Sequence, residues 1–252
     1  MAVLAVEDLV FQSAGSLFDV IVLPVASIEN HGVLPVGSDY IIAKCTVNRL
    51  FERSPAIEPR VAVAPTIPYS NALEHADRGY TVAVPPAAFV EYLSWVIYGL
   101  SSMARSLVVA VFHGGASCSV FDSIRYARWR HGFDSVFLFS FWEQVNRVVG
   151  ELGVDGVFHA DPVEASILLA CGASRGVKSA GEEEVLASQR SLKASLPYPW
   201  MGRDAGFLYP SLEVKASPGL GRKILDMVVD RLVDLISTAA RRSSSGREAL
   251  PG

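Results

Sequence analysis

Three of the five histidines in this 252-residue chain stand where a parallel α/β sheet binds its ligands. His31 follows the apolar run 18–26, and His113 comes directly after the apolar run 107–112. His159 follows a short apolar pair at another expected strand end. Small residues stand beside each of them, which lets backbone and ligand come close. Because ligands bind beyond the carboxyl ends of the strands in an open α/β sheet, we expect these side chains at one edge of the sheet.

Carboxylates lie close to these histidines along the sequence. Glu29 and Asp39 flank His31, and Glu164 lies five residues past His159. Together with the histidines they provide ligands enough for two metal ions. Carboxylate and imidazole groups suit Zn²⁺, Mn²⁺ or Fe²⁺ better than Ca²⁺. The sequence therefore predicts a metal centre that holds two such divalent ions.

The other two histidines are weaker candidates. His75 stands between a glutamate and an alanine, with no strand end directly before it. His131 lies at an expected helix end, where a cationic side chain suits the negative end of the helix dipole. We expect His131 to have a capping or surface role.

Each candidate also has a structural interpretation. Glu29 and His31 could lie in a solvated loop, and Ser38 or Asp39 could cap the helix that follows. His113 could be a hydrogen-bonded histidine of the core, although the two glycines after it argue against plain packing. The joint occurrence of these residues, in order, favours the metal centre.

Glu164 has the most specific structural alternative. With Asp161 before the helix and Pro162 at its first position, Glu164 stands at the third position of a capping box. In that role its carboxylate accepts the backbone N–H of Asp161. The sequence leaves both roles of Glu164 open. It also leaves His159 open as a proton shuttle, a further metal ligand or a structural residue.

Apolar runs of strand length alternate with stretches of helical spacing. Strands are expected at 18–26, 61–64, 107–112 and 135–141, and helices at 39–51, 86–103, 117–130, 162–169 and from 218 onward. Strands that alternate with helices imply a mostly parallel sheet with helices on both sides. The predicted fold class is α/β.

We find no internal repeat and no linker in the sequence, so we expect a single domain over residues 1–240. Residues 241–252 have the composition of a solvated tail. The segment 190–212 is rich in Pro, Gly, Tyr and Trp and is expected to be a long loop. Long ordered loops in compact domains are often functional.

Composition excludes several classes of protein. Apolar residues make up 50% of the chain and charged residues 19%, with a mean hydropathy of +0.32. That is too apolar for a disordered chain, and it favours a sheet buried on both faces or a large subunit interface in a homo-oligomer. The chain has no apolar run of ~18 residues, so we expect no contact with a membrane. A net charge of −4 without a basic cluster speaks against nucleic acid as a partner.

The cysteines and the N-terminus bear on the compartment. Cys45, Cys118 and Cys171 are odd in number, widely spaced and set among apolar or small residues. They are expected to be reduced core residues of a cytoplasmic protein. Glu7 and Asp8 make the N-terminus unlike a signal peptide.

Several segments resemble those of the creatininase (creatinine amidohydrolase) family, in the family's order. They are 23–32 (LPVASIENHG), 34–39 (LPVGSD), 112–115 (FHGG), 159–166 (HADPVEAS), and the C-terminal pair 209–211 and 216–221. The resemblance covers about residues 15–240. It implies a three-layer αβα sandwich around a mostly parallel sheet, often assembled as a hexamer.

The resemblance also implies two divalent metal ions that hydrolyse an amide or formamide C–N bond. Carried over to this chain, Glu29 and His113 bind one metal, His31 binds the other, and Asp39 bridges both. A bridging carboxylate can hold two ions ~3.5–4 Å apart. Water bound there becomes the nucleophile, while the second ion polarises the carbonyl group.

One ligand of the creatinine hydrolases is missing from this chain. In those enzymes the second metal takes a glutamate two residues past the histidine of the HGG-type segment, where this chain has Gly115. We predict Glu164 as the substitute, as in family members with glycine at that position. His159 is predicted as the catalytic proton shuttle, because a nearby histidine can protonate the leaving nitrogen.

Departures from the family pattern fall near the substrate. Ala116 replaces an asparagine, Val33 and Leu34 stand where the family has a second histidine, and Asp161-Pro162 replaces Gly-Glu. Gly115 shifts the prediction from creatinine or another cyclic amide toward a formamide on a pyrimidine nucleotide. The family's deformylases of flavin and deazaflavin biosynthesis act on such a substrate. A non-catalytic relative with an eroded metal site is the alternative from another class.

A serine esterase is excluded. Residues 112–115 also resemble an oxyanion-hole segment, and residues 172–176 match G-x-S-x-G. An α/β-hydrolase needs its histidine after the serine and the acid. No histidine follows Ser174 in this chain.

Overall fold

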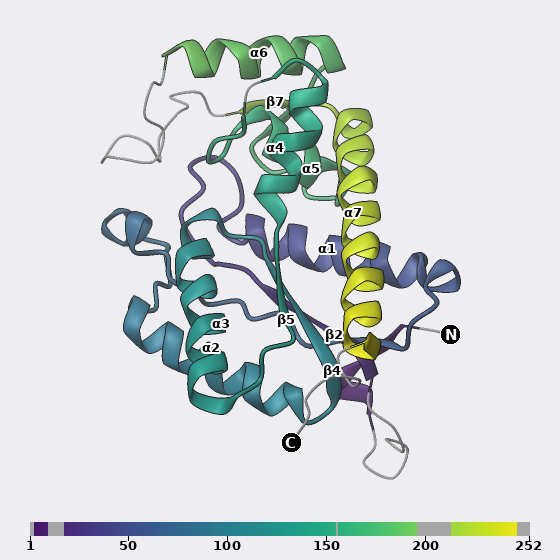
Figure 1. The fold of residues 1–252 in the computed structure, drawn as a ribbon. Helices are drawn as coiled ribbons and strands as arrows, with labels where there is room; N and C mark the ends of the chain where they lie inside the picture. Colours follow the sequence, from purple (N-terminus) through teal and green to yellow (C-terminus); the bar gives the residue numbers. More distant parts are fainter. Residues whose placement is uncertain (1–2, 10–17, 155, 196–212, 246–252) are drawn as a thin grey trace, which may run out of the picture.

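The computed structural model describes residues 3–9, 18–154, 156–195 and 213–245 of this protein. Five parallel strands form the central sheet, in the order β1-β3-β2-β4-β5 (Figure 1). They are β1 (Leu4–Ala5), β2 (Phe18–Val25), β3 (Val61–Val63), β4 (Ala104–Val111) and β5 (Val136–Ser140). The four predicted strands are all present, and β1 is an additional strand at the edge.

The two longest strands, β2 and β4, lie side by side at the centre of the sheet. They pair in register along their whole length, from Phe18 with Ala104 to Val25 with Val111. Their side chains alternate between two apolar clusters, one on each face of the sheet. Burial of both faces explains why these strands are continuous apolar runs.

Helices cover both faces of the sheet. One face is covered by α1 (Ser38–Glu52), α4 (Phe141–Glu151), α5 (Pro162–Ala170) and α7 (Pro218–Ser245), and the other by α2 (Pro86–Ser101) and α3 (Ser117–His131) (Figure 1). Two helical layers around a parallel sheet confirm the predicted α/β class and the three-layer αβα arrangement.

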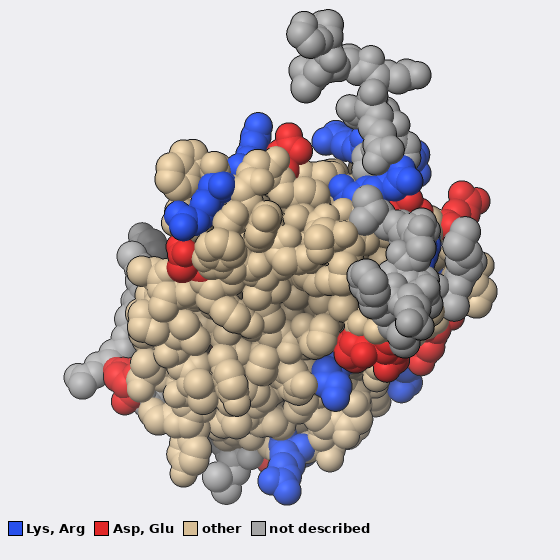
Figure 2. Space-filling view, turned by 90° about the horizontal axis from the view of Figure 1, so that it is seen from below, with Lys and Arg blue, Asp and Glu red and all other residues tan. Residues whose placement is uncertain are grey.

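The outer surface of α2 and α3 is rich in exposed aromatic side chains. They are Tyr92, Trp95, Tyr98, Phe121 and Trp129. Glu91 is the one charged residue of α2, which runs along the bottom of the molecule in Figure 1. The view from below shows a broad area without charged side chains (Figure 2). Even so, none of the described helices is both long and apolar enough to cross a membrane.

A small second sheet lies beyond the central one. It pairs β6 (Val177–Ser179) with β7 (Val214–Ala216) in parallel, and α6 (Glu182–Ser195) follows β6 (Figure 1). None of these elements was predicted. The loop expected over 190–212 is helical as far as Ser195, and its remainder lies outside the described residues. Residues 241–245, expected to be tail, continue α7, and 246–252 are not described.

Two strand boundaries and one expected strand differ from the prediction. β4 begins at Ala104 rather than at 107, because the polar Ser106 is satisfied inside the sheet by Ser135 Oγ at 2.7 Å. α4 begins directly where β5 ends, and it buries Phe141 and Val145 on one face. The apolar pair 157–158 is not a strand, so His159 lies on a turn before α5 rather than at a strand end.

The cysteines contradict the prediction of three reduced core residues. Cys45 in α1 and Cys171 at the end of α5 form a disulfide, with a Cα–Cα distance of 5.7 Å. Cys118 is free and exposed. The 126-residue separation of the bonded pair hid their proximity, which arises because α1 and α5 pack on the same face of the sheet. The cysteines therefore no longer support the predicted cytoplasmic location, which stays a prediction.

Breaking this disulfide should lower the melting temperature. The bond closes a loop of more than a hundred residues, which in the chain-entropy model stabilises the fold by about 4–5 kcal/mol. For a chain of this length that corresponds to roughly 10 °C. Thermal unfolding of the double variant Cys45→Ala/Cys171→Ala measures the effect, with Cys118→Ala as the control. An unchanged melting temperature in the double variant would contradict the disulfide.

Candidate metal centre

All six residues predicted for the site lie together at the carboxyl edge of the central sheet. Glu29 and His31 lie on the loop after β2, and His113 lies two residues past the end of β4. The other three, Asp39, His159 and Glu164, come from the start of α1, the turn before α5 and the first turn of α5. The sheet edge thus brings together segments that are far apart in sequence.

The loop after β2 is held in a defined shape. The backbone N–H of Glu29 donates to Val36 O at 2.9 Å, which closes the loop on itself. Gly32 has a φ of +58°, a left-handed conformation that glycine adopts without strain. Glu29 and His31 are each 1% exposed. The interpretation of these two residues as part of a solvated loop is therefore wrong.

Asp39 lies between two histidines. Its Oδ2 accepts a hydrogen bond from Ser27 Oγ at 2.7 Å and lies 3.3 Å from His113 Nδ1. Its Oδ1 lies 3.9 Å from His31 Nε2. No side chain caps the start of α1, and Ser38 Oγ donates to a backbone carbonyl group of the preceding turn. The interpretation of Ser38 or Asp39 as a helix cap is therefore wrong.

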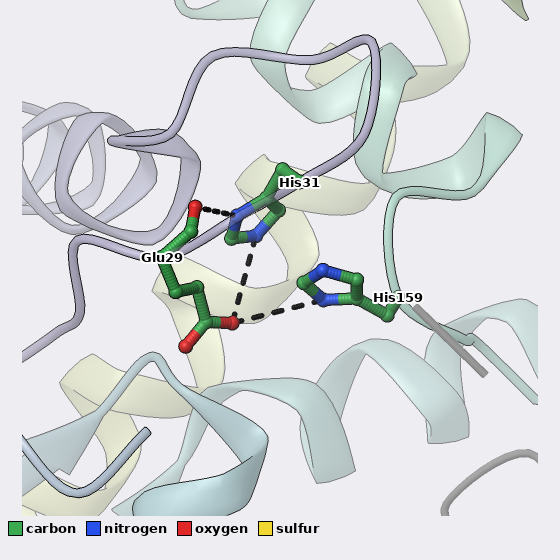
Figure 3. Close-up of side chains that lie close together, drawn as sticks. All are labelled: Glu29, His31 and His159. Carbon is green, nitrogen blue, oxygen red and sulfur yellow. Dashed lines mark hydrogen bonds and ion pairs between the residues drawn. The ribbon is translucent and has the colours of Figure 1, made fainter. Parts of the chain in front are cut away.

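The ring of His31 is fixed by its own loop. Nδ1 lies 3.0 Å from the backbone oxygen of Glu29 (Figure 3). A carbonyl oxygen can only accept, so Nδ1 carries the proton and Nε2 faces the carboxylates. Nε2 lies 3.2 Å from Glu164 Oε1 and 4.0 Å from Glu29 Oε1. A backbone partner of this kind is the usual way to orient a histidine that binds a metal.

His113 faces the same carboxylates from the end of β4. Its Nδ1 lies 3.1 Å from Glu29 Oε2 and 3.3 Å from Asp39 Oδ2. The ring is almost fully buried. A hydrogen-bonded core histidine needs one acceptor at a ring nitrogen, whereas Nδ1 of His113 faces two carboxylates.

Glu164 combines the two roles that the sequence left open. Asp161 Oδ1 accepts the backbone N–H of Glu164 at 2.8 Å, and Glu164 Oε2 accepts the backbone N–H of Ala160 at 2.7 Å. The reciprocal bond of the capping box thus goes to Ala160, which has a φ of +55°, and not to Asp161. The other oxygen, Oε1, faces His31 and is buried without a hydrogen-bond partner. One carboxylate oxygen caps the helix and the second remains for a ligand.

His159 faces Glu29 from the turn before α5. Its Nε2 lies 2.7 Å from the backbone oxygen of Asn30. Its Nδ1 lies 3.7 Å from Glu29 Oε1 (Figure 3). The carbonyl oxygen requires the proton on Nε2, so Nδ1 has a free electron pair directed into the site. Burial, together with the neighbouring His31 and His75 rings, holds the pKa of His159 well below its usual value. At neutral pH the ring of His159 is therefore neutral, and Nδ1 keeps its free electron pair.

Two residues of the site, His75 and Glu74, were not predicted from the sequence. His75 stacks on His159 with ring centroids 4.2 Å apart, and its Nε2 lies 3.7 Å from Glu29 Oε1. Glu74 Oε1 lies 3.1 Å from His113 Nε2. Both belong to a short 3₁₀ helix, η4 (Leu73–Arg78), between β3 and α2. That segment follows β3, but it begins ten residues after the strand ends, so its position after a strand did not identify it.

The donor atoms fall into two sets that share Asp39. Among the described residues, Glu29, Asp39 and His113 form one set, and His31, Asp39 and Glu164 form the other. Within each set the donor atoms lie within 4.8 Å of one another, and all five residues are buried. A third set joins Glu29, His31 and His159, which keeps the ligand role of His159 open.

These residues fit divalent cations. In the described part of the chain, the ion-pair partners of the three buried carboxylates are all histidines. Glu29 Oε2 and Glu164 Oε1 are buried and have no hydrogen-bond partner. Burial of carboxylate charge is costly unless a cation compensates it, and here that cation is either a protonated histidine or a metal ion. The mixed carboxylate and imidazole set suits Zn²⁺, Mn²⁺ or Fe²⁺.

Without a cation, protons take its place on the histidines. Burial alone would lower the pKa of His31, but the carboxylates of Glu164, Asp39 and Glu29 outweigh it and raise this pKa to about 10. His113 behaves alike: its pKa is raised well above the usual value, because Glu29, Asp39 and Glu74 outweigh the effect of burial. A cation must displace these protons in order to bind.

Metal binding should therefore become tighter as the pH rises. In chelator, a raised pKa on His31 contributes stability that is complete below pH 6.5 and is lost as the pH rises toward 10. Each displaced proton should increase the apparent metal affinity about tenfold per pH unit. Competition with a chelating dye between pH 6.5 and 8.5 measures this slope. A pH-independent affinity would show that these histidines do not bind the metal.

A cavity opens beside the donor atoms. Glu29, Asp39 and His113 line it. The indole of Trp142, from the first turn of α4, lines the cavity together with Phe158. Trp142 is held by a hydrogen bond from Nε1 to the backbone oxygen of Phe112. The cavity is thus lined by charged and by aromatic residues.

A family model described as Creatininase: Creatinine amidohydrolase matches residues 10–236. No curated protein matches the chain significantly. A crystal structure of creatinine amidohydrolase (creatininase) has a TM-score of 0.67 at 20% identity and covers 94% of this chain and 98% of that chain.

Two further solved structures carry a metal in their description. One described as creatininase Mn has a TM-score of 0.66 at 21% identity and covers 93% of this chain and 97% of that chain. A creatininase mutant described as Zn-Zn type has a TM-score of 0.66 at 20% identity and covers 94% and 98%. At these identities the likeness establishes a common fold.

Proposed function

This chain belongs to the creatininase family, and from that premise we propose that it is a metal-dependent hydrolase of a non-peptide amide C–N bond, with two divalent ions in each subunit. One observation carries the proposal: two buried donor sets meet at Asp39. A single ion would need one set only, and a helix cap would need neither. An eroded, non-catalytic relative would not keep all five donor residues buried at one sheet edge.

Zn²⁺, Mn²⁺ and Fe²⁺ are the proposed ions. The solved relatives described with Mn and Zn-Zn support the first two. In such a site, divalent cations supply Lewis acidity toward a carbonyl oxygen and a water nucleophile at neutral pH. Glu29 and His113 would hold one ion, His31 and Glu164 the other, and Asp39 both.

His159 is proposed to move the proton. In amide hydrolysis a C–O bond forms and a C–N bond breaks, so one proton of the attacking water must reach the leaving nitrogen. The Nδ1 atom of His159 has a free electron pair that faces the site, and its Nε2–H is held by Asn30 O at 2.7 Å. A neutral histidine in this position can accept the water proton and return it to nitrogen.

The proposed substrate is a formamide on a pyrimidine nucleotide. Gly115, where the creatinine hydrolases have a glutamate, argues against creatinine itself. The aromatic wall of the cavity, with Trp142 and Phe158, can contact a planar base. A cyclic amide of the creatinine type is the second candidate, supported by the description of the family model.

Product analysis after metal loading tests this function. Protein loaded with Mn²⁺, Zn²⁺ or anaerobic Fe²⁺ is incubated with a formylamino-pyrimidine nucleotide, with simple formamides and with creatinine. We expect formate release from the nucleotide that is lost in the His159→Ala variant. Creatine formation without formate release would support the second candidate, and no product with any substrate would contradict the proposed hydrolase.

Self-association is proposed for the aromatic surface of α2 and α3. The exposed aromatic side chains there and the single charge of α2 resemble an interface core more than a solvated surface. Closed symmetric assemblies are the usual result of such self-complementary surfaces. Light scattering at micromolar concentration should show a homo-oligomer, with a hexamer as the expected size. A monomer would overturn this proposal and leave the metal centre untouched.

A further inference from the structure

Gly115 and Glu74 form a steric pair beside the metal centre. A Cβ atom on Gly115 would overlap the carboxylate of Glu74 and would lie 2.7 Å from His113 Nε2. Gly115 is therefore not simply a missing side chain: the space next to His113 is filled by a carboxylate from another segment. That segment is η4, which lies between β3 and α2.

Glu74 reaches the side of the His113 ring that faces away from the donor sets. Nδ1 of His113 faces Glu29 and Asp39, at 3.1 and 3.3 Å, whereas Nε2 lies 3.1 Å from Glu74 Oε1. The Glu74 side chain is one-third exposed, while the His113 ring is 4% exposed. Glu74 thus lies at the rim and closes the buried ring off on its outer side.

We propose that Glu74 is a positioning residue for His113, and that the absence of a side chain at Gly115 is what admits it. Its carboxylate keeps the single ring proton of neutral His113 on Nε2. Nδ1 then retains its electron pair for the metal held with Glu29 and Asp39. This inference rests on the proposed metal centre and adds to it a residue that was not predicted.

Neutral imidazole has one N–H group, and either ring nitrogen can carry it. A carboxylate next to Nε2 favours the proton there, orients the ring and increases the electron density on Nδ1. Glu74 itself lies outside the three donor sets formed by the described residues. It therefore acts through His113, and the geometry does not support it as a direct ligand.

Four variants test the inference through metal affinity. Glu74→Ala removes the carboxylate, and Gly115→Ala leaves it in the chain but displaces it. Loss of an outer carboxylate on a metal-binding histidine typically weakens binding about 10–100-fold. We expect Glu74→Ala and Gly115→Ala each to weaken Mn²⁺ binding by such a factor, as measured by competition with a chelating dye. The loss in Glu74→Ala/Gly115→Ala should be smaller than the product of the two single losses, because both changes remove the same contact, although the added methyl group also approaches His113 Nε2. Glu74→Gln should recover part of the affinity, since its side-chain oxygen can still lie beside His113 Nε2.

The controls match each change. Glu58→Ala removes an exposed carboxylate at the opposite end of β3. Gly99→Ala adds a methyl group to a helical glycine whose Cβ would meet nothing within 4 Å. Both controls should bind Mn²⁺ like the wild type. Melting curves in excess chelator check that each variant is folded, and Glu74→Gln decides the test if Gly115→Ala does not fold.

The outcomes separate this inference from the proposed function. Unchanged Mn²⁺ affinity in Glu74→Ala, with a wild type that binds Mn²⁺, would overturn the role of Glu74 alone. Additive losses in the double variant would overturn the steric pairing with Gly115. A wild type that binds no Mn²⁺, Zn²⁺ or Fe²⁺ would overturn the metal centre and with it this inference.

Discussion

Replacing Asp39 with alanine should leave the purified protein with well under one divalent ion per chain and no measurable amide hydrolysis. Asp39 belongs to both donor sets of the proposed dinuclear centre, so its loss leaves each of them with one carboxylate and one histidine. The third set, Glu29 with His31 and His159, does not replace them, because His159 is proposed as the proton shuttle. Two ligands do not close a metal site in a protein, because even catalytic sites keep three. The remaining carboxylates, Glu29 and Glu164, would then be neutralised by the histidines rather than by cations.

The neighbouring residue provides the control. Ser38 occupies the same helical turn but donates its hydroxyl group to Pro35 O, away from the donor atoms. Ser38→Ala should cost about 1 kcal/mol of unfolding free energy and leave the metal content unchanged. Metal analysis by inductively coupled plasma mass spectrometry compares the two variants directly. Full metal content in Asp39→Ala would reject the bridging role.

Glu164→Gln should bind one ion fewer than the wild type and lose most hydrolysis. The structure assigns the two carboxylate oxygens different partners: Oε2 accepts from Ala160 N–H and Oε1 faces His31. Glutamine can keep the first contact through its carbonyl oxygen. It cannot offer the negative charge that a divalent ion requires, so it is a much poorer ligand.

Comparison with Glu164→Ala separates the cap from the ligand. In excess chelator, the alanine variant loses the hydrogen bond to Ala160 and should melt at a lower temperature than the glutamine variant. Both should lack the same ion. Normal metal content and rate in Glu164→Gln would make this residue a cap alone.

Asp161 could not then replace it as a ligand. Its Oδ1 accepts the backbone N–H of Glu164, and its Oδ2 accepts from Phe158 N–H and from Gln189 Nε2. Burial raises the pKa of Asp161 to about 7, and the hydrogen bonds only partly offset that effect. With both oxygens engaged, Asp161 holds the turn that carries His159. A cap-only Glu164 would thus leave a site for a single ion.

The central part of the fold could be predicted from the sequence because its strands are buried on both faces. β2 and β4 read as continuous apolar runs, and each is followed by residues of the site. The short strands β6 and β7 have exposed lysines between smaller residues and give no such pattern. The disulfide could not be predicted either, because no local sequence pattern indicates that Cys45 and Cys171 are neighbours in the fold.

The site residues could be predicted where they come soon after a strand or stand at the start of a helix. The loop after β2 carries Glu29 and His31, and His113 lies two residues past β4. The family resemblance then assigned a role to each of them. Glu74 and His75 lie in a short 3₁₀ helix ten or more residues past β3, where no periodic pattern reports position. Their contacts depend on how η4 folds back over the sheet edge, which only the structure reveals.

The stoichiometry of metal binding tests the central claim most directly. Chelator-treated protein is titrated with Mn²⁺ in equilibrium dialysis at pH 8, and the bound ions are counted per chain. Two donor sets that share Asp39 predict saturation at two ions per chain, with a rise in melting temperature on loading. Saturation at one ion or fewer per chain would contradict the dinuclear centre on which this account of the protein rests.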